Sequence, residues 1–151
     1  MKAVLTSALL ATTVFASSLA AATPEQEKAF IAAYRKALEA HDEKALAAFL
    51  YTEGADPETV GFFKMMQQGD PGAKITSIEL VAPTPDETAK FNKPMTMPDG
   101  KAYVLPVKPI KQLVIKTESK DANGSGTSSS KSPVAEVKGK LVIPVPVPQK
   151  K

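Results

Sequence analysis

The hydrophobic period of the chain changes at Gly69–Asp70–Pro71–Gly72, and this change limits the possible folds more than any other feature. Upstream of the turn, apolar residues recur every three to four positions, which is the spacing of a buried stripe on an α-helix. Downstream, they tend to alternate with polar residues, as in a β-strand with one buried face. This order predicts an α+β domain in which N-terminal helices pack on a curved antiparallel sheet of about four strands.

Three helix starts are predicted before the turn. Thr23, Pro24 and Gln26 have the spacing of a capping box with proline at the first helical position. Asp42 is the predicted N-cap of a short second helix, and Asp56 is that of a third. The predicted buried stripes of these helices contain Phe30, Ile31, Tyr34, Ala37, Leu38, Leu46, Phe49, Leu50, Val60, Phe63 and Met66.

The strands are predicted in four segments after the turn. Residues 74–81, 102–105 and 111–117 are short apolar or alternating runs, and a fourth strand is predicted within 132–147. The turn at 97–101 is expected to join the second of these strands to the segment before it as a hairpin.

Two polar or proline-rich segments are predicted to lie outside the core. Residues 119–132 are mostly Ser, Gly, Lys and Thr, which predicts a flexible loop, either a tolerated surface insertion or a mobile lid. Residues 144–151 form a Pro-rich tail, and proline cannot donate to a sheet ladder. The tail is therefore predicted to block a sheet edge, with docking into an aromatic groove of a partner as the alternative.

Residues 1–22 have the features of a signal peptide. Lys2 precedes a short apolar run and small residues, so cleavage is predicted after Ala22, or alternatively after Ala20. An uncleaved membrane anchor is the other interpretation. A bacterial-type leader predicts a periplasmic or secreted protein, and residues 23–151 have the size of a single domain. The chain contains no cysteine, so neither disulfides nor thiolate metal sites support the fold.

Charge is distributed unevenly along the predicted mature chain. Residues 23–88 contain 12 acids and 6 bases, whereas residues 89–151 contain 4 acids and 12 bases, all of them lysines. Lysines that alternate with apolar residues are predicted to line one sheet face and attract phospholipid, anionic polysaccharide or an acidic protein. The alternative is that they protect the sheet from aggregation. Nucleic acid is not an expected partner, since the chain has a single arginine. The lysines concerned are Lys111, Lys116, Lys138 and Lys140.

Catalytic motifs are absent from the sequence. It contains no Gly-x-Ser-x-Gly, no phosphate loop and no glycine-rich dinucleotide turn. The one histidine, His41, precedes Asp42 at a helix break, where an exposed imidazole is favoured over a general base. One histidine without cysteine leaves only carboxylates as metal ligands, so no metal or other cofactor is expected.

Residues 30–46 resemble the opening of nuclear transport factor 2-like domains, a superfamily of cystatin-like α+β cones. Members begin with a long helix with aromatic-x-x-x-Tyr spacing, which Phe30 and Tyr34 match, followed by an acidic break and a second small helix. The resemblance implies a strongly bent sheet that forms a cone-shaped pocket. The superfamily includes isomerases, dehydratases and non-catalytic members, so this fold does not determine function.

The leading expectation is an exported, non-catalytic module that binds a small ligand or a protein partner. One alternative is a pocket enzyme resembling ketosteroid isomerase or the dehydratases of that fold, which requires a carboxylate near Tyr34 in a shared cavity. The other is a cell-envelope-associated protein that uses the lysine-rich sheet face. A homodimer formed through the sheet remains open as well. The predicted pocket residues are Phe30, Tyr34, Phe49, Phe63 and Tyr103.

Overall fold

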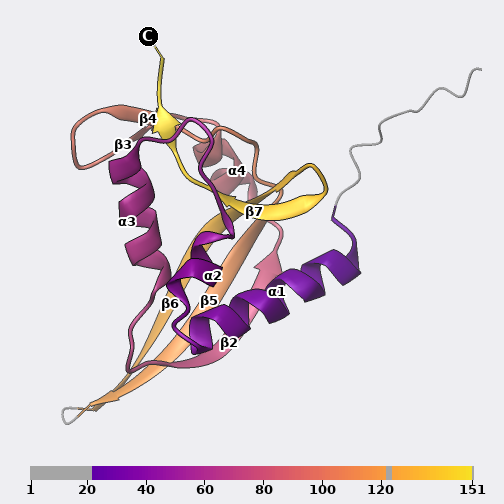
Figure 1. The fold of residues 1–151 in the computed structure, drawn as a ribbon, viewed down its shortest axis with the longest axis vertical. Coiled ribbons are helices and arrows are strands. Elements are labelled where there is room, and N and C mark those ends of the chain that lie inside the picture. Colours follow the sequence, from indigo (N-terminus) through magenta and orange to yellow (C-terminus); the bar gives the residue numbers. More distant parts are fainter. Residues whose placement is uncertain (1–21, 122–123, 151) are drawn as a thin grey trace, which may run out of the picture.

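The computed structural model describes residues 22–121 and 124–150, and it confirms the mixed α+β class (Figure 1). The helices of these residues are α1 (Pro24–Glu39), α2 (Glu43–Ala47), α3 (Pro57–Gln67) and α4 (Pro85–Phe91). The strands are β1 (Leu50–Tyr51), β2 (Lys74–Val81), β3 (Met95–Thr96), β4 (Ala102–Val104), β5 (Lys111–Asp121), β6 (Gly124–Val137), β7 (Lys140–Pro144) and β8 (Val147–Pro148).

These strands form two sheets rather than the one predicted. The larger has five strands in the order β1-β7-β6-β5-β2, and the smaller has three in the order β3-β4-β8. Only the β1–β7 pair is parallel. In Figure 1, α1 and α2 lie in front of the large sheet, and β5 and β6 extend beyond the helices as a long two-stranded arm. The predicted number of about four strands was therefore too low.

The three predicted helix starts are confirmed. Thr23 and Gln26 form a reciprocal capping box, with backbone-to-side-chain distances of 2.7 and 3.2 Å. The Asp42 carboxylate accepts from the backbone N–H of Ala45 at 2.9 Å, and Asp56 accepts from that of Thr59 at 2.8 Å. Because each cap depends only on residues three positions apart, the sequence alone is sufficient to place it.

The core lies between the helices and the large sheet. The rings of Phe30, Tyr34 and Phe49 contact one another with centroids 5.1 to 6.0 Å apart. Below them, Leu113 of β5 and Ile143 of β7 are almost fully buried. Edge-to-face aromatic contacts and the burial of branched side chains fix α1 across the sheet.

The segment 119–132 was predicted to be a flexible loop, and this prediction was wrong for its described residues. Residues 119–121 and 124–132 are paired strand residues, with register from Leu113↔Ser132 out to Asp121↔Gly124. The prediction relied on apolar content, which this segment lacks. Serine and threonine nevertheless suit an extended backbone when cross-strand partners lie opposite, and the ladder supplies those partners.

The segment 132–147 was predicted as one strand, but a tight turn divides it into β6 and β7. Lys138 and Gly139 both have positive φ, 51° and 79°, as the two central residues of a type I′ hairpin turn require. The Gln26 side chain donates to the Gly139 carbonyl at 3.1 Å and links this turn to the start of α1.

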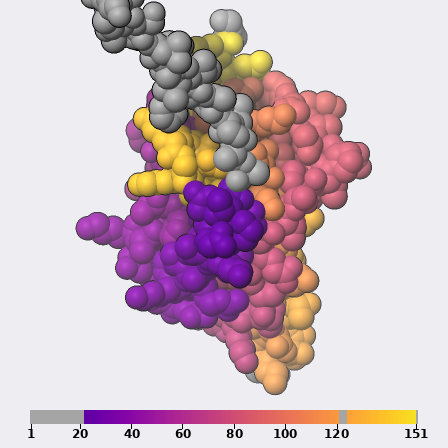
Figure 2. Space-filling model, turned by 90° about the vertical axis from the view of Figure 1, so that its right-hand side faces the viewer, coloured from indigo at the N-terminus to yellow at the C-terminus, as the bar shows by residue number. Residues whose placement is uncertain are grey.

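The predicted Pro-rich tail begins with residues that belong to the core. Pro144, Val145 and Pro146 are fully buried, and the Val145 N–H donates to the Tyr51 carbonyl at 2.9 Å. Val147 then pairs with Val104 at the edge of the small sheet, which confirms the expected edge position for this part. Figure 2 shows the strand that leads into this segment, the golden β7, directly against α1, in indigo.

Helix α4 was not predicted, although its start has a clear local signal. Thr84, Pro85 and Glu87 repeat the capping-box pattern seen at α1, and both reciprocal bonds form, at 2.8 and 3.2 Å. Glu87 also binds the Lys131 ammonium at 2.9 Å, which ties α4 to β6.

We expect Glu87 to make folding sensitive to acid. The Thr84 backbone N–H and then the Lys131 ammonium lower the pKa of Glu87 from 4.5 to about 2. The carboxylate therefore stabilises the fold above pH 4.5, and this contribution disappears as the pH falls toward 2. Chemical denaturation across this pH range should show a shallower loss of stability for Glu87→Gln than for the wild type. The control Glu79→Gln, at an exposed position of β2, should retain the wild-type slope.

The predicted signal peptide, apart from Ala22, lies outside the described residues. Within residues 22–121 and 124–150, no helix has the length and apolar character needed to cross a membrane.

Candidate functional site

A cavity of about 290 Å³ lies between the helical layer and the β5–β6 arm. Its apolar lining comes from Leu38 of α1, Phe63 of α3, and Ile115 and Ile143 of the sheet. Its remaining lining is mostly polar and uncharged. A pocket of about this size that combines apolar walls with a few polar groups is typical of small-ligand sites.

The polar wall of the cavity comes from alternate residues of β5 and β6. Side chains of a strand alternate between its two faces, so Thr117 and Ser119 lie on the same face as Ile115. The register places Ser128 directly opposite Thr117, and Ser130 directly opposite Ile115. Together the two strands present a grid of hydroxyl groups beside an apolar floor, made by Thr117, Ser119, Ser128, Ser130 and Ser132.

Tyr34 supplies a buried phenol to this cavity. Only 2% of the residue is exposed, and its ring packs between Phe30 and Phe49. Burial raises the pKa of Tyr34 to about 12, against a smaller lowering by the nearby Gln67 side chain. The phenol is therefore protonated at neutral pH and is available as a neutral hydrogen-bond donor.

Gln67 is the last residue of α3, and it lies beside the same cavity. Both polar atoms of its side-chain amide are unpaired. Its nitrogen and oxygen each expose less than 1 Å² and make no hydrogen bond to the described residues. The Gln67 amide lies close enough to the Tyr34 hydroxyl to lower the pKa of Tyr34. The amide and the hydroxyl nevertheless do not reach hydrogen-bonding geometry. A buried amide without partners is costly, so this position stands out from the rest of the core.

A second hollow of about 280 Å³ adjoins the first beside residues 68–73. The two share Leu38, Gly69, Asp70, Ala73 and Thr117 as lining residues. His41 lines only the second hollow, where it is exposed with a positive φ of 48°. This exposed position agrees with the favoured interpretation of His41 at a helix break.

No family model, curated protein or solved structure matches this chain. The cavity and the groups that line it are therefore the basis for inferring function.

The structure brings together four of the five predicted pocket residues. Tyr34 and Phe63 line the cavity, and Phe30 and Phe49 pack behind Tyr34 in the adjoining core. Tyr103 is buried elsewhere, in the small sheet. Sequence reasoning missed the hydroxyl wall, although the alternation of serine at 128, 130 and 132 is a signal for one strand face.

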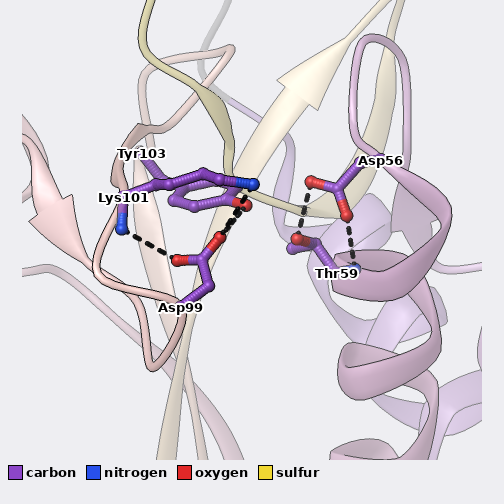
Figure 3. A network of polar contacts seen from close by, with 5 residues as sticks. All are labelled: Asp56, Thr59, Asp99, Lys101 and Tyr103. Atoms are coloured by element: carbon purple, nitrogen blue, oxygen red, sulfur yellow. Dashed lines mark hydrogen bonds and ion pairs between the residues drawn. The ribbon is translucent and has the colours of Figure 1, made fainter.

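Tyr103 lies where two groups of polar contacts face each other, one in the small sheet and one at the start of α3 (Figure 3). Its hydroxyl donates to Asp99 at 2.9 Å, while Asp56 accepts from the backbone and side chain of Thr59, each at 2.8 Å. Thr59 lowers the pKa of Tyr103, but Asp99, burial and the charge of Asp56 together raise it. Each carboxylate caps a turn of its own chain segment, which favours a structural role for these contacts.

The four predicted surface lysines do not share one sheet face. Lys111 and Lys116 are five positions apart on the regular strand β5, so their side chains lie on opposite faces. The Lys111 ammonium pairs with Glu27 of α1 at 2.9 Å. Lys138 lies in the β6–β7 turn and Lys140 begins β7. The prediction that these lysines line one sheet face is therefore wrong.

Carboxylates are sparse around the cavity. Asp70 is the one acidic residue in its described lining, and its Oδ1 accepts from the Gly72 N–H at 3.0 Å within an exposed turn. Within the described ranges, no cluster of three or more His, Asp or Glu side chains has an arrangement suited to a metal ion.

Proposed function

We propose that this protein is an exported, non-catalytic module that binds a small neutral ligand in the cavity between α1, α3 and the β5–β6 arm. The observation that carries the proposal is the combination of an apolar floor, a wall of hydroxyl groups and a protonated phenol around one cavity of about 290 Å³. Export rests on the predicted signal peptide.

The lining favours an amphipathic ligand with one apolar face and one hydroxylated edge. Phe63 and Ile115 offer apolar contact, and Ser128 and Ser130 offer groups that both donate and accept hydrogen bonds. The Lys131 ammonium is already paired with Glu87. A neutral ligand with adjacent hydroxyl groups satisfies this lining better than an anion or a cation does.

We also propose that the fold is similar to that of nuclear transport factor 2-like domains. The order of α1, α2 and α3 before most of the large sheet, and a cavity between helices and sheet, support it. Binding is favoured over catalysis because Asp70, the carboxylate at the cavity, is engaged in its own turn. A Tyr34 pKa of about 12 keeps the phenol protonated at neutral pH, so Tyr34 can donate a hydrogen bond to a bound ligand.

Titration with cis-1,2-cyclohexanediol tests the proposal, because this neutral ring has one apolar face and two adjacent hydroxyl groups. We expect saturable shifts of the Leu38, Ile115 and Ile143 methyl signals in NMR spectra of the mature chain. Ser130→Leu should abolish them, since leucine at this position fills the cavity.

Ser129→Leu is the matched control, because Ser129 is the exposed neighbour on the opposite face of β6. It should leave the titration unchanged. Equal binding to both variants, or no saturable shift in the wild type, would contradict the proposed site.

A further inference from the structure

Strand β6 has a long free edge. It pairs with β5 from Gly124 to Val134, but β7 covers its other side only from Ala135 to Val137. Among the described residues, nothing pairs with the outer edge of residues 124–133. Alternate backbone N–H and C=O groups along this edge are therefore available to another strand.

Pro133 and Lys131 stand at the inner end of this edge, but its outer part, residues 124–130, lacks the features that usually prevent strands from associating. Residues 124–130 are Gly, Ser and Thr only, without a charge or a proline. Lys131 follows, but its ammonium is bound to Glu87 on α4. Natural edge strands are commonly protected by free lysines, prolines or bulges, so an unprotected edge of this length favours an interface.

An exposed apolar patch on α3 lies on the same side of the molecule. Phe62 is 39% exposed, Met65 61% and Met66 62%. Met66 lines the same cavity as Ser128 and Ser130, which places the patch next to the free edge. In Figure 1, α3 and β6 are both on the left of the molecule.

We infer that a second copy of this chain binds here, with the two β6 edges paired antiparallel and the two α3 patches beside them. A two-fold interface brings each surface against its own copy, so charges of one sign repel. The uncharged edge and the apolar patch avoid this repulsion. The interface lies beside the proposed ligand cavity, but the inference rests on the strand edge and the apolar patch and does not require that a ligand binds.

Sedimentation of the mature chain over a range of concentrations tests this inference. The wild type is expected to change from monomer to dimer mass as its concentration rises. Thr127→Lys on the edge and Met65→Lys on the patch should each keep the chain monomeric, because each places two like charges across the two-fold axis.

Thr96→Lys is the matched control, since Thr96 is an exposed strand threonine in the small sheet. It should dimerise like the wild type, and circular dichroism should show that all variants are folded. A wild type that is monomeric at every concentration would overturn the inference. So would a dimer that survives Thr127→Lys or one that Thr96→Lys disrupts.

Discussion

A chain that ends after Ile143 is expected to lose most of its stability or to remain unfolded. The truncation removes Pro144, Val145 and Pro146, which are fully buried, and the hydrogen bond from Val145 to Tyr51. Burying one valine side chain contributes roughly 1.5–3 kcal/mol. The total loss should therefore exceed about 3 kcal/mol, a large share of the roughly 5–15 kcal/mol typical of a domain.

Urea denaturation followed by circular dichroism measures this loss. A chain that ends after Gln149 is the control, because it retains the segment 144–148 and the bond from the Gln149 N–H to Ala102 at 2.9 Å. Similar unfolding midpoints for the two truncated chains would show that the proline-rich segment is a dispensable tail after all.

Gln67→Met is expected to stabilise the ligand-free protein. Methionine has a similar length and shape, and it removes two buried amide atoms that lack hydrogen-bond partners. Leaving such groups unpaired costs roughly 1–3 kcal/mol, so the free energy of unfolding should rise by about this amount. Most core substitutions lower stability, which makes a gain here diagnostic.

The matched control for this substitution is Gln68→Met, at the next position, beyond the end of α3. It should change stability little. If Gln67→Met lowers the free energy of unfolding, then the amide is paired in solution, with Tyr34 as the nearest candidate.

The local signals in the sequence were sufficient to place the three N-terminal helices, although Met66, predicted in the buried stripe of the third, is 62% exposed. Thr23, Asp42 and Asp56 each cap a helix through contacts within three residues, and the stripe containing Phe30 and Tyr34 is buried as its spacing predicts. These features depend on neighbours along the chain, so no knowledge of the tertiary structure is needed.

Two of the features that the sequence analysis missed depend on distant partners. Residues 124–132 become a strand because β5 lies opposite, and Val145 is buried because β1 and the small sheet surround it. Neither outcome follows from local composition. The lysine error was different in kind, since counting the five positions between Lys111 and Lys116 already places them on opposite strand faces.

The position of bound cis-1,2-cyclohexanediol tests the central claim most directly. Intermolecular nuclear Overhauser effects should connect its ring protons to the methyl groups of Ile115 and Ile143, on the floor of the cavity. Contacts instead to Val104 and Val107, which line a separate hollow beside α4, would contradict the account.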